Sequence, residues 1–209
     1  MFSKLLGIRL HSTRLPLALY GVLSSFPTCN SFKCAPRNFP YMMIKIIAAC
    51  DQNRVMGRQG KLPWNIPEDW TYFLEQTEGG VLVMGRRCYE DFIDYAAQRE
   101  VIGLSRNPQY QFEHARRAQS LSEALTLAGQ SGKTIWICGG YDIYKEALPL
   151  ANELFLTEID AQFDGDTHFP EWKDSFPEKR SVRIVQTRDF KITFSVYTKG
   201  TGYIFPKLA

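Results

Sequence analysis

Three short apolar runs are the feature of this sequence that most restricts its fold. They are IKIIAAC (44–50), GVLVMG (80–85) and TIWICGG (134–140). Each run is nearly continuous and contains several β-branched residues. Such runs are typical of strands that are covered on both faces, which is the usual situation in parallel sheets. The sequence therefore predicts a sheet whose central strands lie between two layers of helices.

Helical patterns follow most of these runs, and two further strand patterns close the chain. The clearest helix is 120–129, in which Ser120 is the expected cap, Glu123 completes a capping box and Gly129 marks the end. We expect helices at 67–77, 86–93, 120–129 and 141–148, strands at 99–105 and 153–160, a hairpin of 181–187 with 190–198, and a polar loop at 51–65. This alternation predicts the α/β class, with a predominantly parallel central sheet, flanking helices and an antiparallel C-terminal edge strand.

Residues 1–42 differ in composition from the rest of the 209-residue chain. They hold five of its 25 bases, several serines and no Asp or Glu. A basic, acid-free segment of this kind is typical of an organelle transit peptide. Alternatively, the true start is Met42 or Met43 and the extension is mis-called. We expect the functional domain at 43–209, in the cytoplasm, or in mitochondria if the extension is a genuine transit peptide.

The charge of the predicted domain excludes several classes of partner. Residues beyond the extension carry 20 bases and 22 acids, whereas a nucleic-acid-binding surface needs a basic excess. The nine-residue apolar run at 15–23 is much shorter than the roughly 20 residues of a membrane-spanning helix. The five cysteines lack a CxxC pair and the three histidines are scattered, so we expect free thiols and no metal site. We therefore expect neither nucleic acid nor a membrane as a partner.

Glycines and arginines stand where three of the predicted strands end. In open α/β sheets, ligands bind beyond the carboxyl ends of strands, where helix N-termini direct N–H groups outward. Each pattern alone also suits a plain turn or a solvated surface, and the GxGxxG fingerprint is absent. Together they indicate a phosphorylated cofactor with enough arginine nearby for an extra phosphate, hence NADPH rather than NADH. The residues concerned are Gly85, Arg86, Arg87, Arg106, Gly139 and Gly140.

One carboxylate is expected to face apolar surface. In LPWNIPEDWTYF (62–73), Pro67 is a suitable first residue of a helix. Asp69 then shares a helix face with Tyr72 and Phe73, because side chains three and four apart are neighbours. The ordinary alternative is that Asp69 only stabilises the helix start through the dipole. Otherwise Asp69 is the unusual acid of this segment, because an unpaired charge is costly to bury against apolar surface and burial raises the pKa of a carboxyl group.

Taken in order, these motifs resemble those of dihydrofolate reductases. The matching segments are IIAAC, GKLPWNIPEDW, VMGRRCYE, CGGYDIY, LTEID and GDTHFP, which lie between residues 46 and 170. The resemblance covers essentially all of residues 43 to 200. The most specific is the Trp-x-x-Pro-x-Asp pattern of Trp64, Pro67 and Asp69. The resemblance implies a dihydrofolate reductase-like fold, a monomer, and NADPH-dependent reduction of 7,8-dihydrofolate to 5,6,7,8-tetrahydrofolate, which supplies one-carbon metabolism and thymidylate synthesis.

The resemblance also implies roles for individual residues. Asp69 would hydrogen-bond the 2-amino group and adjacent ring nitrogen of the pterin, with Thr157 supporting it. Trp64 would order a water molecule, and Leu62 would lie in the mobile loop that closes over the site. The implied substrate-binding residues are Ala49, Phe73, Arg99, Cys138 and Tyr144. The implied cofactor-binding residues are Ala49, Met56, Gly57, Gly85, Arg86, Arg87, Cys88, Ser105, Arg106, Gly139 and Gly140, with a cis peptide between the last two.

Two features of the sequence differ from the family pattern, and one other enzyme is an alternative to the resemblance. The segment before Arg99 lacks the family's proline-rich turn, so Arg99 would grip the glutamate tail of the substrate only by position, and otherwise it is a surface arginine at a strand edge. Cys88 replaces the usual threonine. The rival enzyme is the NADPH-dependent pyrimidine reductase of riboflavin synthesis, which is expected to lack the Asp69 pattern.

Overall fold

The apolar run at 44–50 becomes the middle of an eight-stranded sheet. The computed structural model describes residues 42–200, and the expectations for the N-terminal extension lie outside the described residues, except at Met42. The strand order is β5-β4-β3-β6-β1-β7-β10-β9. The strands are β1 (Ile44–Asp51), β3 (Val81–Gly85), β4 (Glu100–Leu104), β5 (Arg116–Ala118), β6 (Ile135–Ile137), β7 (Glu153–Ile159), β9 (Glu178–Gln186) and β10 (Lys191–Thr198).

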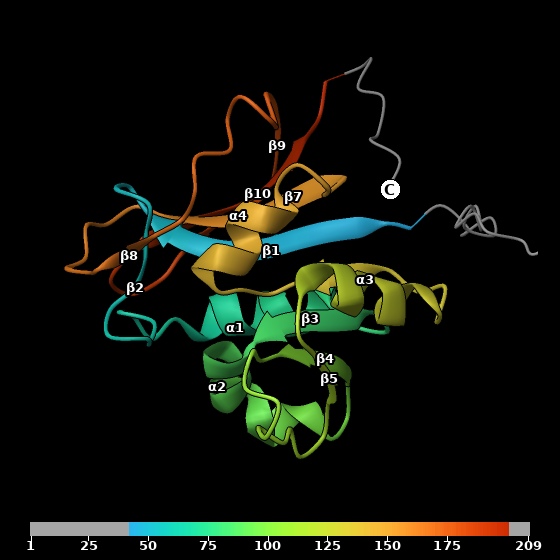
Figure 1. The fold of residues 1–209 in the computed structure, drawn as a ribbon. Helices are drawn as coiled ribbons and strands as arrows, with labels where there is room; N and C mark the ends of the chain where they lie inside the picture. Colours follow the sequence, from blue (N-terminus) through green and yellow to red (C-terminus); the bar gives the residue numbers. More distant parts are fainter. Residues whose placement is uncertain (1–41, 201–209) are drawn as a thin grey trace, which may run out of the picture. The chain divides into compact units, whose positions relative to one another are not determined.

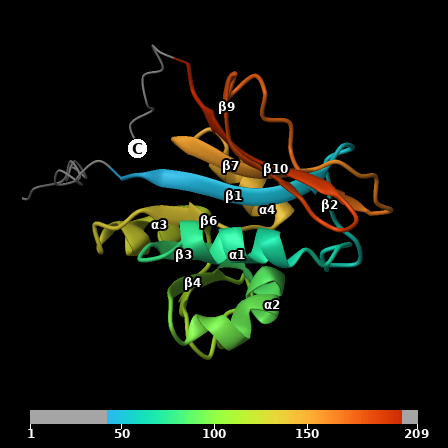
Figure 2. The same cartoon turned by 180° about the vertical axis from the view of Figure 1, so that it is seen from behind.

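The pairing confirms the predicted fold class. All pairs from β5 to β7 are parallel, whereas β10 is antiparallel to both β7 and β9. The closing strands form the predicted hairpin, which continues the sheet outward from β7 (Figure 2). Within this hairpin β9 takes the edge and β10 lies one place inside it.

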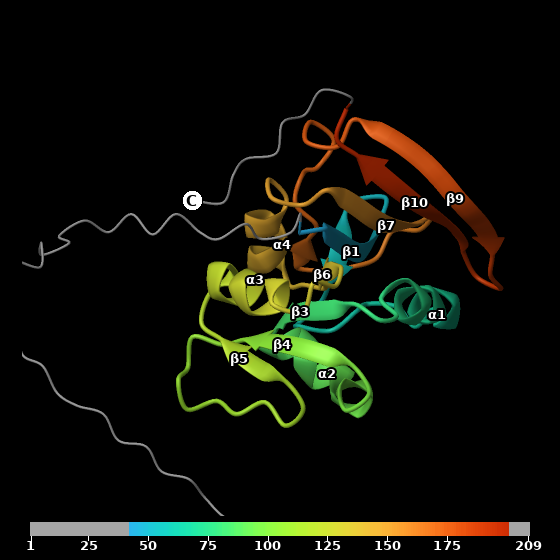
Figure 3. The same cartoon turned by 90° about the vertical axis from the view of Figure 1, so that its right-hand side faces the viewer.

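Four helices cover the two faces of the sheet. They are α1 (Pro67–Gln76), α2 (Arg86–Ala96), α3 (Leu121–Gly129) and α4 (Tyr141–Ala147). Figure 3 shows α3 and α4 on one side of the sheet and α1 and α2 on the other. As predicted, α1 begins at Pro67, and the Ser120 side chain caps α3 by accepting from the backbone N–H of Glu123.

Burial on both faces explains the continuous apolar runs. In β3, Val81 and Val83 belong to the core that includes α3 and α4. Their neighbours Leu82 and Met84 point to the opposite face and pack with side chains of α2. Because alternate residues of a strand face opposite sides, a strand between two helix layers needs apolar residues at every position.

The prediction of a plain loop at 51–65 is wrong, because part of this segment is a strand. Strand β2 (Val55–Gly57) pairs with β8 (Thr167–His168) in a separate two-stranded sheet. Figure 1 shows this small sheet beyond the carboxyl end of β1. The partner of β2 lies more than a hundred residues away in the chain, so no local pattern announces the pairing. Strand β5 was missed for a related reason, since its three residues RRA carry no apolar run.

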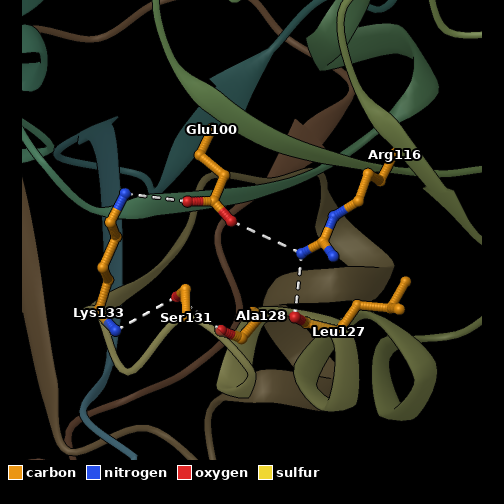
Figure 4. Close-up of polar contacts among 6 residues, drawn as sticks. All are labelled: Glu100, Arg116, Leu127, Ala128, Ser131 and Lys133. Carbon is orange, nitrogen blue, oxygen red and sulfur yellow. Dashed lines mark hydrogen bonds and ion pairs between the residues drawn. The ribbon is translucent and has the colours of Figure 1, made fainter. Parts of the chain in front are cut away.

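A polar network joins the first residues of β4 and β5 to the last turn of α3 (Figure 4). Glu100 accepts from the Nζ of Lys133 at 3.1 Å and lies 3.6 Å from an Nη2 of Arg116. Arg116 also donates to the backbone carbonyl of Leu127 in α3, at 3.0 Å. These side chains are partly exposed, so the network orders this edge of the sheet and contributes little to the free energy of unfolding. Within residues 42–200, no helix is both long enough and apolar enough to cross a membrane.

Asp51 secures the segment that leaves β1 toward β2. Its buried carboxylate accepts from the backbone N–H groups of Asn53 and Val55 through Oδ1, at 2.8 and 2.7 Å. Its Oδ2 accepts from the N–H of Phe163 at 2.7 Å. A single side chain therefore holds together two loops that are distant in sequence.

We expect Asp51→Ala to lower the free energy of unfolding by about 2–3 kcal/mol, because one buried and two partly buried hydrogen bonds lose their charged acceptor. Urea unfolding followed by circular dichroism measures this change. The exposed Asp174, replaced by alanine, is the matched control and should change the value by less than about 0.5 kcal/mol. Equal effects of the two substitutions would contradict the account.

Candidate active site

A cavity of about 930 Å³ lies at the carboxyl ends of β1, β3 and β6. We call it the main cavity. Most of the residues predicted for the site border it: Ala49, Met56, Gly57, Leu62, Asp69, Phe73, Gly85, Arg86, Arg87, Cys88, Cys138, Gly139, Gly140 and Tyr144. The parallel strands end here because each is followed by a loop or a helix that crosses back over the sheet, as is usual in α/β folds.

Asp69 supplies a carboxylate to the wall of the main cavity from the first turn of α1. Its side chain is partly accessible from the cavity, but the surrounding protein removes most of the water from its carboxyl group. This burial raises the pKa of Asp69 to about 6, and a hydrogen bond with the Thr157 side chain opposes the rise. The raised pKa confirms the expectation for a carboxylate placed among aromatic rings.

An aromatic wall continues from Asp69 along the same helix. Trp70 and Phe73 border the main cavity together with Phe92 of α2. The rings of Trp70 and Phe73 are stacked with centroids 5.4 Å apart, and Phe92 meets Phe73 edge-on at 5.9 Å. The carboxylate thus borders the same cavity as three aromatic rings that pack against one another.

Trp64 and Thr157 lie in the protein behind this wall. Thr157 is buried on β7, in register with Ala49 of β1, which borders the main cavity. Trp64 is buried against Phe163, with ring centroids 5.2 Å apart. The indole N–H of Trp64 is buried and has no hydrogen-bond partner among the residues that the structure describes. A buried donor of this kind needs a partner, which an ordered water molecule or a ligand would provide.

The Gly139–Gly140 turn forms the floor of the main cavity where β6 meets α4. The peptide bond between these glycines is cis, as the resemblance implies, and Gly139 has a φ of 113°. Its carbonyl accepts from the N–H of Gly85 at 2.8 Å, which links the ends of β6 and β3. A Cβ at Gly139 would lie 3.2 Å from both the Cys88 sulfur and the Tyr144 hydroxyl. Only glycine suits this position.

The start of α2 presents positive charge to the main cavity. Helix α2 follows Gly85, has no side-chain cap and carries no acid in its first turn. Arg86 and Arg87 occupy that turn and border the cavity. Arg86 is held by Glu90 at 2.7 Å and lies over the ring of Tyr110, whereas the structure places Arg87 against the loop at Gly60. Free N–H groups and two guanidinium groups at one helix start suit an anion.

Residues 57–62, which we call the lid loop, border the main cavity opposite α2. The loop turns tightly, with reciprocal backbone hydrogen bonds between Arg58 and Lys61 at 2.8 and 3.0 Å. Asp166 anchors it: its Oδ2 accepts from the N–H of Gln59 at 2.8 Å, and its own N–H donates to the carbonyl of Gly57 at 3.0 Å. The hydrogen bond from Gln59 lowers the pKa of Asp166.

The lid loop and the segment around β8 bring residues to the cavity that sequence reasoning did not select. Lys61 comes from the lid loop, and Asp166, Thr167 and His168 come from β8 and the residue before it. The motif GDTHFP (165–170) is the sequence signal that could have identified the last three of these residues. Its Gly165 has no room for a side chain, because a Cβ there would lie 2.3 Å from Val55. That glycine allows the close approach of the two segments. Leu62 borders the cavity while its side chain remains 54% exposed.

Besides Trp64 and Thr157, three predicted residues do not border the main cavity. Ser105 is buried just beyond β4, where its hydroxyl accepts from the N–H of Asn107, and Arg106 beside it is exposed. Arg99 lies immediately before β4, and its side chain is 15% exposed. It contacts the Leu74 carbonyl of α1 and the Glu78 side chain just beyond that helix.

Comparison with known proteins identifies the family. The model of the dihydrofolate reductase family matches residues 43–199. The chain is 43% identical to a type 3 dihydrofolate reductase of Salmonella typhimurium over 131 residues, covering 63% of this chain and 80% of the relative. It is 35% identical to the dihydrofolate reductase of Neisseria gonorrhoeae over 162 residues, covering 75% and 98%.

A solved structure gives the same result. The dihydrofolate reductase from Enterococcus faecalis, in complex with NADP(H) and RAB-propyl, is 33% identical and superposes with a TM-score of 0.67, covering 76% of this chain and 97% of the other. The family match spans nearly the whole described fold, including Asp69 at the start of α1 and the glycine turn after β6. This chain belongs to the dihydrofolate reductase family.

Proposed function

We propose that this chain reduces 7,8-dihydrofolate to 5,6,7,8-tetrahydrofolate with NADPH. The single observation that carries the proposal is Asp69: a largely desolvated carboxyl group in the wall of the main cavity, beside an aromatic surface and hydrogen-bonded to Thr157. Family membership supplies the reaction, and this site supplies the group that the reaction needs. The alternative, a pyrimidine reductase of riboflavin synthesis, is not favoured, because the family model and the relatives are dihydrofolate reductases.

Asp69 would recognise one edge of the pterin. The 2-amino group and the neighbouring ring nitrogen of a pterin form a pair of donors, which matches the two oxygens of a carboxylate. Phe73 and Trp70 would pack against the flat ring. Thr157, held in register with Ala49, keeps the carboxyl group oriented.

The remaining half of the cavity fits NADPH. Arg86, Arg87 and the uncapped N–H groups of α2 would hold phosphate, and the small residues Gly85, Gly139 and Gly140 let a ligand approach the backbone. The other residues that we assign to this cofactor are Ala49, Met56, Gly57, Cys88, Ser105 and Arg106. Bound NADPH supplies the hydride for the pterin ring. Leu62 and the lid loop would cover the two ligands and exclude water.

Asp69 would also control the proton that the reduced ring gains at nitrogen five. A carboxyl group with a pKa of about 6 is partly protonated near neutral pH, so it can hold a proton inside a site from which most water is excluded. Trp64 would contribute its unpaired indole N–H to a water molecule between the acid and the ring.

We expect Asp69→Asn to lower kcat for dihydrofolate by about 10²–10⁴-fold, because it removes a general acid. The wild-type rate of the hydride step should decrease as the pH rises through about 6, since only the protonated carboxyl can supply the proton. The variant should show a low rate without this transition. Stopped-flow absorbance at 340 nm across pH 5–9 measures both. Unchanged turnover in the variant would contradict the proposed role of Asp69.

The same substitution should stabilise the fold at high pH. Burial raises the pKa of Asp69 above its unfolded value near 3.8, so the fold loses stability as the pH rises through about 6 and the buried group ionises. Asparagine cannot ionise. Its advantage in free energy of unfolding should grow by about 1 kcal/mol between pH 5 and pH 8. Glu68→Gln in the same helical turn is the control, and equal pH dependence in both variants would refute the assignment.

Residues 43–209 form the proposed catalytic domain, acting as a monomer. A chain that starts at Met43 should therefore have the same kcat and KM as the full chain and elute as a monomer in size-exclusion chromatography with light scattering. We propose a cytoplasmic protein, or a mitochondrial one if residues 1–42 are a transit peptide. The N-terminal mass of the protein from its native cell distinguishes these two cases.

A further inference from the structure

Arg99 lies outside the main cavity, but its charged side chain is mostly buried. Its guanidinium donates to the carbonyl of Leu74 at 3.3 Å and to Glu78 at 2.9 Å, both through Nη2. The other terminal nitrogen, Nη1, is buried and lacks a hydrogen-bond partner within residues 42–200. Because a guanidinium cannot lose its proton in a protein, this leaves donor capacity for a further acceptor.

The contacts of Arg99 lie in line with the aromatic wall of the cavity. Trp70, Leu74 and Glu78 are spaced four residues apart along α1 and the turn that follows it, so they fall on one side of the helix. Trp70 borders the main cavity. Successive positions in this row are about 6 Å apart, so a ligand that extends from Asp69 along α1 past Trp70 approaches Arg99 at its far end.

The ion pair between Arg99 and Glu78 is asymmetric. The Arg99 side chain is 15% exposed, whereas that of Glu78 is 76% exposed. Among the described residues, Glu78 is the carboxylate that lies within 4 Å of Arg99. A largely exposed partner is held weakly, because water and salt screen its charge, so another carboxylate can displace it at small cost.

We infer that Glu78 competes with the terminal carboxylate of the substrate for Arg99 and so sets the affinity for ligands that carry a glutamate tail. This inference rests on the proposed function, since dihydrofolate ends in glutamate carboxylates. Glu78 occupies the guanidinium in the free protein, and the substrate tail takes its place on binding. Glu78 is then a specificity-determining residue that weakens binding of tailed substrates and leaves tail-less pterins unaffected.

The test compares two substrates in two variants. Glu78→Gln removes the competing charge, and Glu75→Gln removes an exposed acid from the last turn of the same helix as the matched control. KM and kcat are measured for dihydrofolate and for a 7,8-dihydropterin that has a methyl group in place of the aminobenzoyl-glutamate tail. Both acids lie near the C-terminus of α1, where negative charge is unfavourable, so neither substitution threatens the helix.

We expect Glu78→Gln to lower the KM for dihydrofolate by about two- to fivefold, the range set by a weak exposed ion pair, with kcat unchanged. The KM for the tail-less pterin should stay the same, and Glu75→Gln should alter neither. Adding Arg99→Gln to Glu78→Gln should abolish the gain.

Three outcomes would overturn the inference: equal effects of the two glutamine variants, a lower KM for both substrates, or a higher KM for dihydrofolate alone in Glu78→Gln. The last would mean that Glu78 orients Arg99 instead of competing for it. Failure of the wild-type protein to reduce either substrate is a separate result, which would refute the proposed function itself.

Discussion

The buried carboxyl group of Asp69 is the constraint on which the rest of the site depends. An acid in a largely desolvated position is unfavourable for the fold when it is ionised, and this burial raises the pKa of Asp69. The protein keeps the acid because α1 begins at Pro67 and aims its first turn at the cavity, and because Thr157 of β7 offers a hydrogen bond. The start of α1 and the register of β7 therefore both position the Asp69 carboxyl at the cavity wall. A pterin would provide the pair of hydrogen-bond donors that this carboxyl can accept.

The architecture distributes different tasks around this group. Parallel strands bring the ends of β1, β3 and β6 to one edge, so residues far apart in sequence border the same cavity. The glycine turn after β6 gives access to the backbone, and the start of α2 supplies positive charge. The small β2–β8 sheet holds the lid loop opposite them, with Asp166 as its anchor. Each feature follows from local chemistry, but the order of the strands in the sheet decides that all of them border the same cavity.

Features that depend on local pattern could be predicted from the sequence. The runs 44–50 and 80–85 revealed the central strands because burial on both faces leaves them apolar throughout. The acid at 69 was identified because helical spacing placed it beside aromatic residues. Features made by contacts between distant segments could not be predicted: β2 forms only through β8, and the partner of Arg99 is Glu78, some twenty positions earlier. A short strand with a remote partner leaves no period in the sequence.

The central claim is that the Asp69 carboxyl is desolvated in the free protein and binds the amino edge of a pterin. A carbon-13 NMR titration of the aspartate carboxyl carbons tests it most directly, with Asp69→Asn assigning the resonance. The expected result is a carboxyl that titrates near pH 6 in the free protein and whose resonance shifts when a ligand with a 2-amino pterin edge binds. A carboxyl that titrates near 4 and does not respond to such a ligand would contradict it.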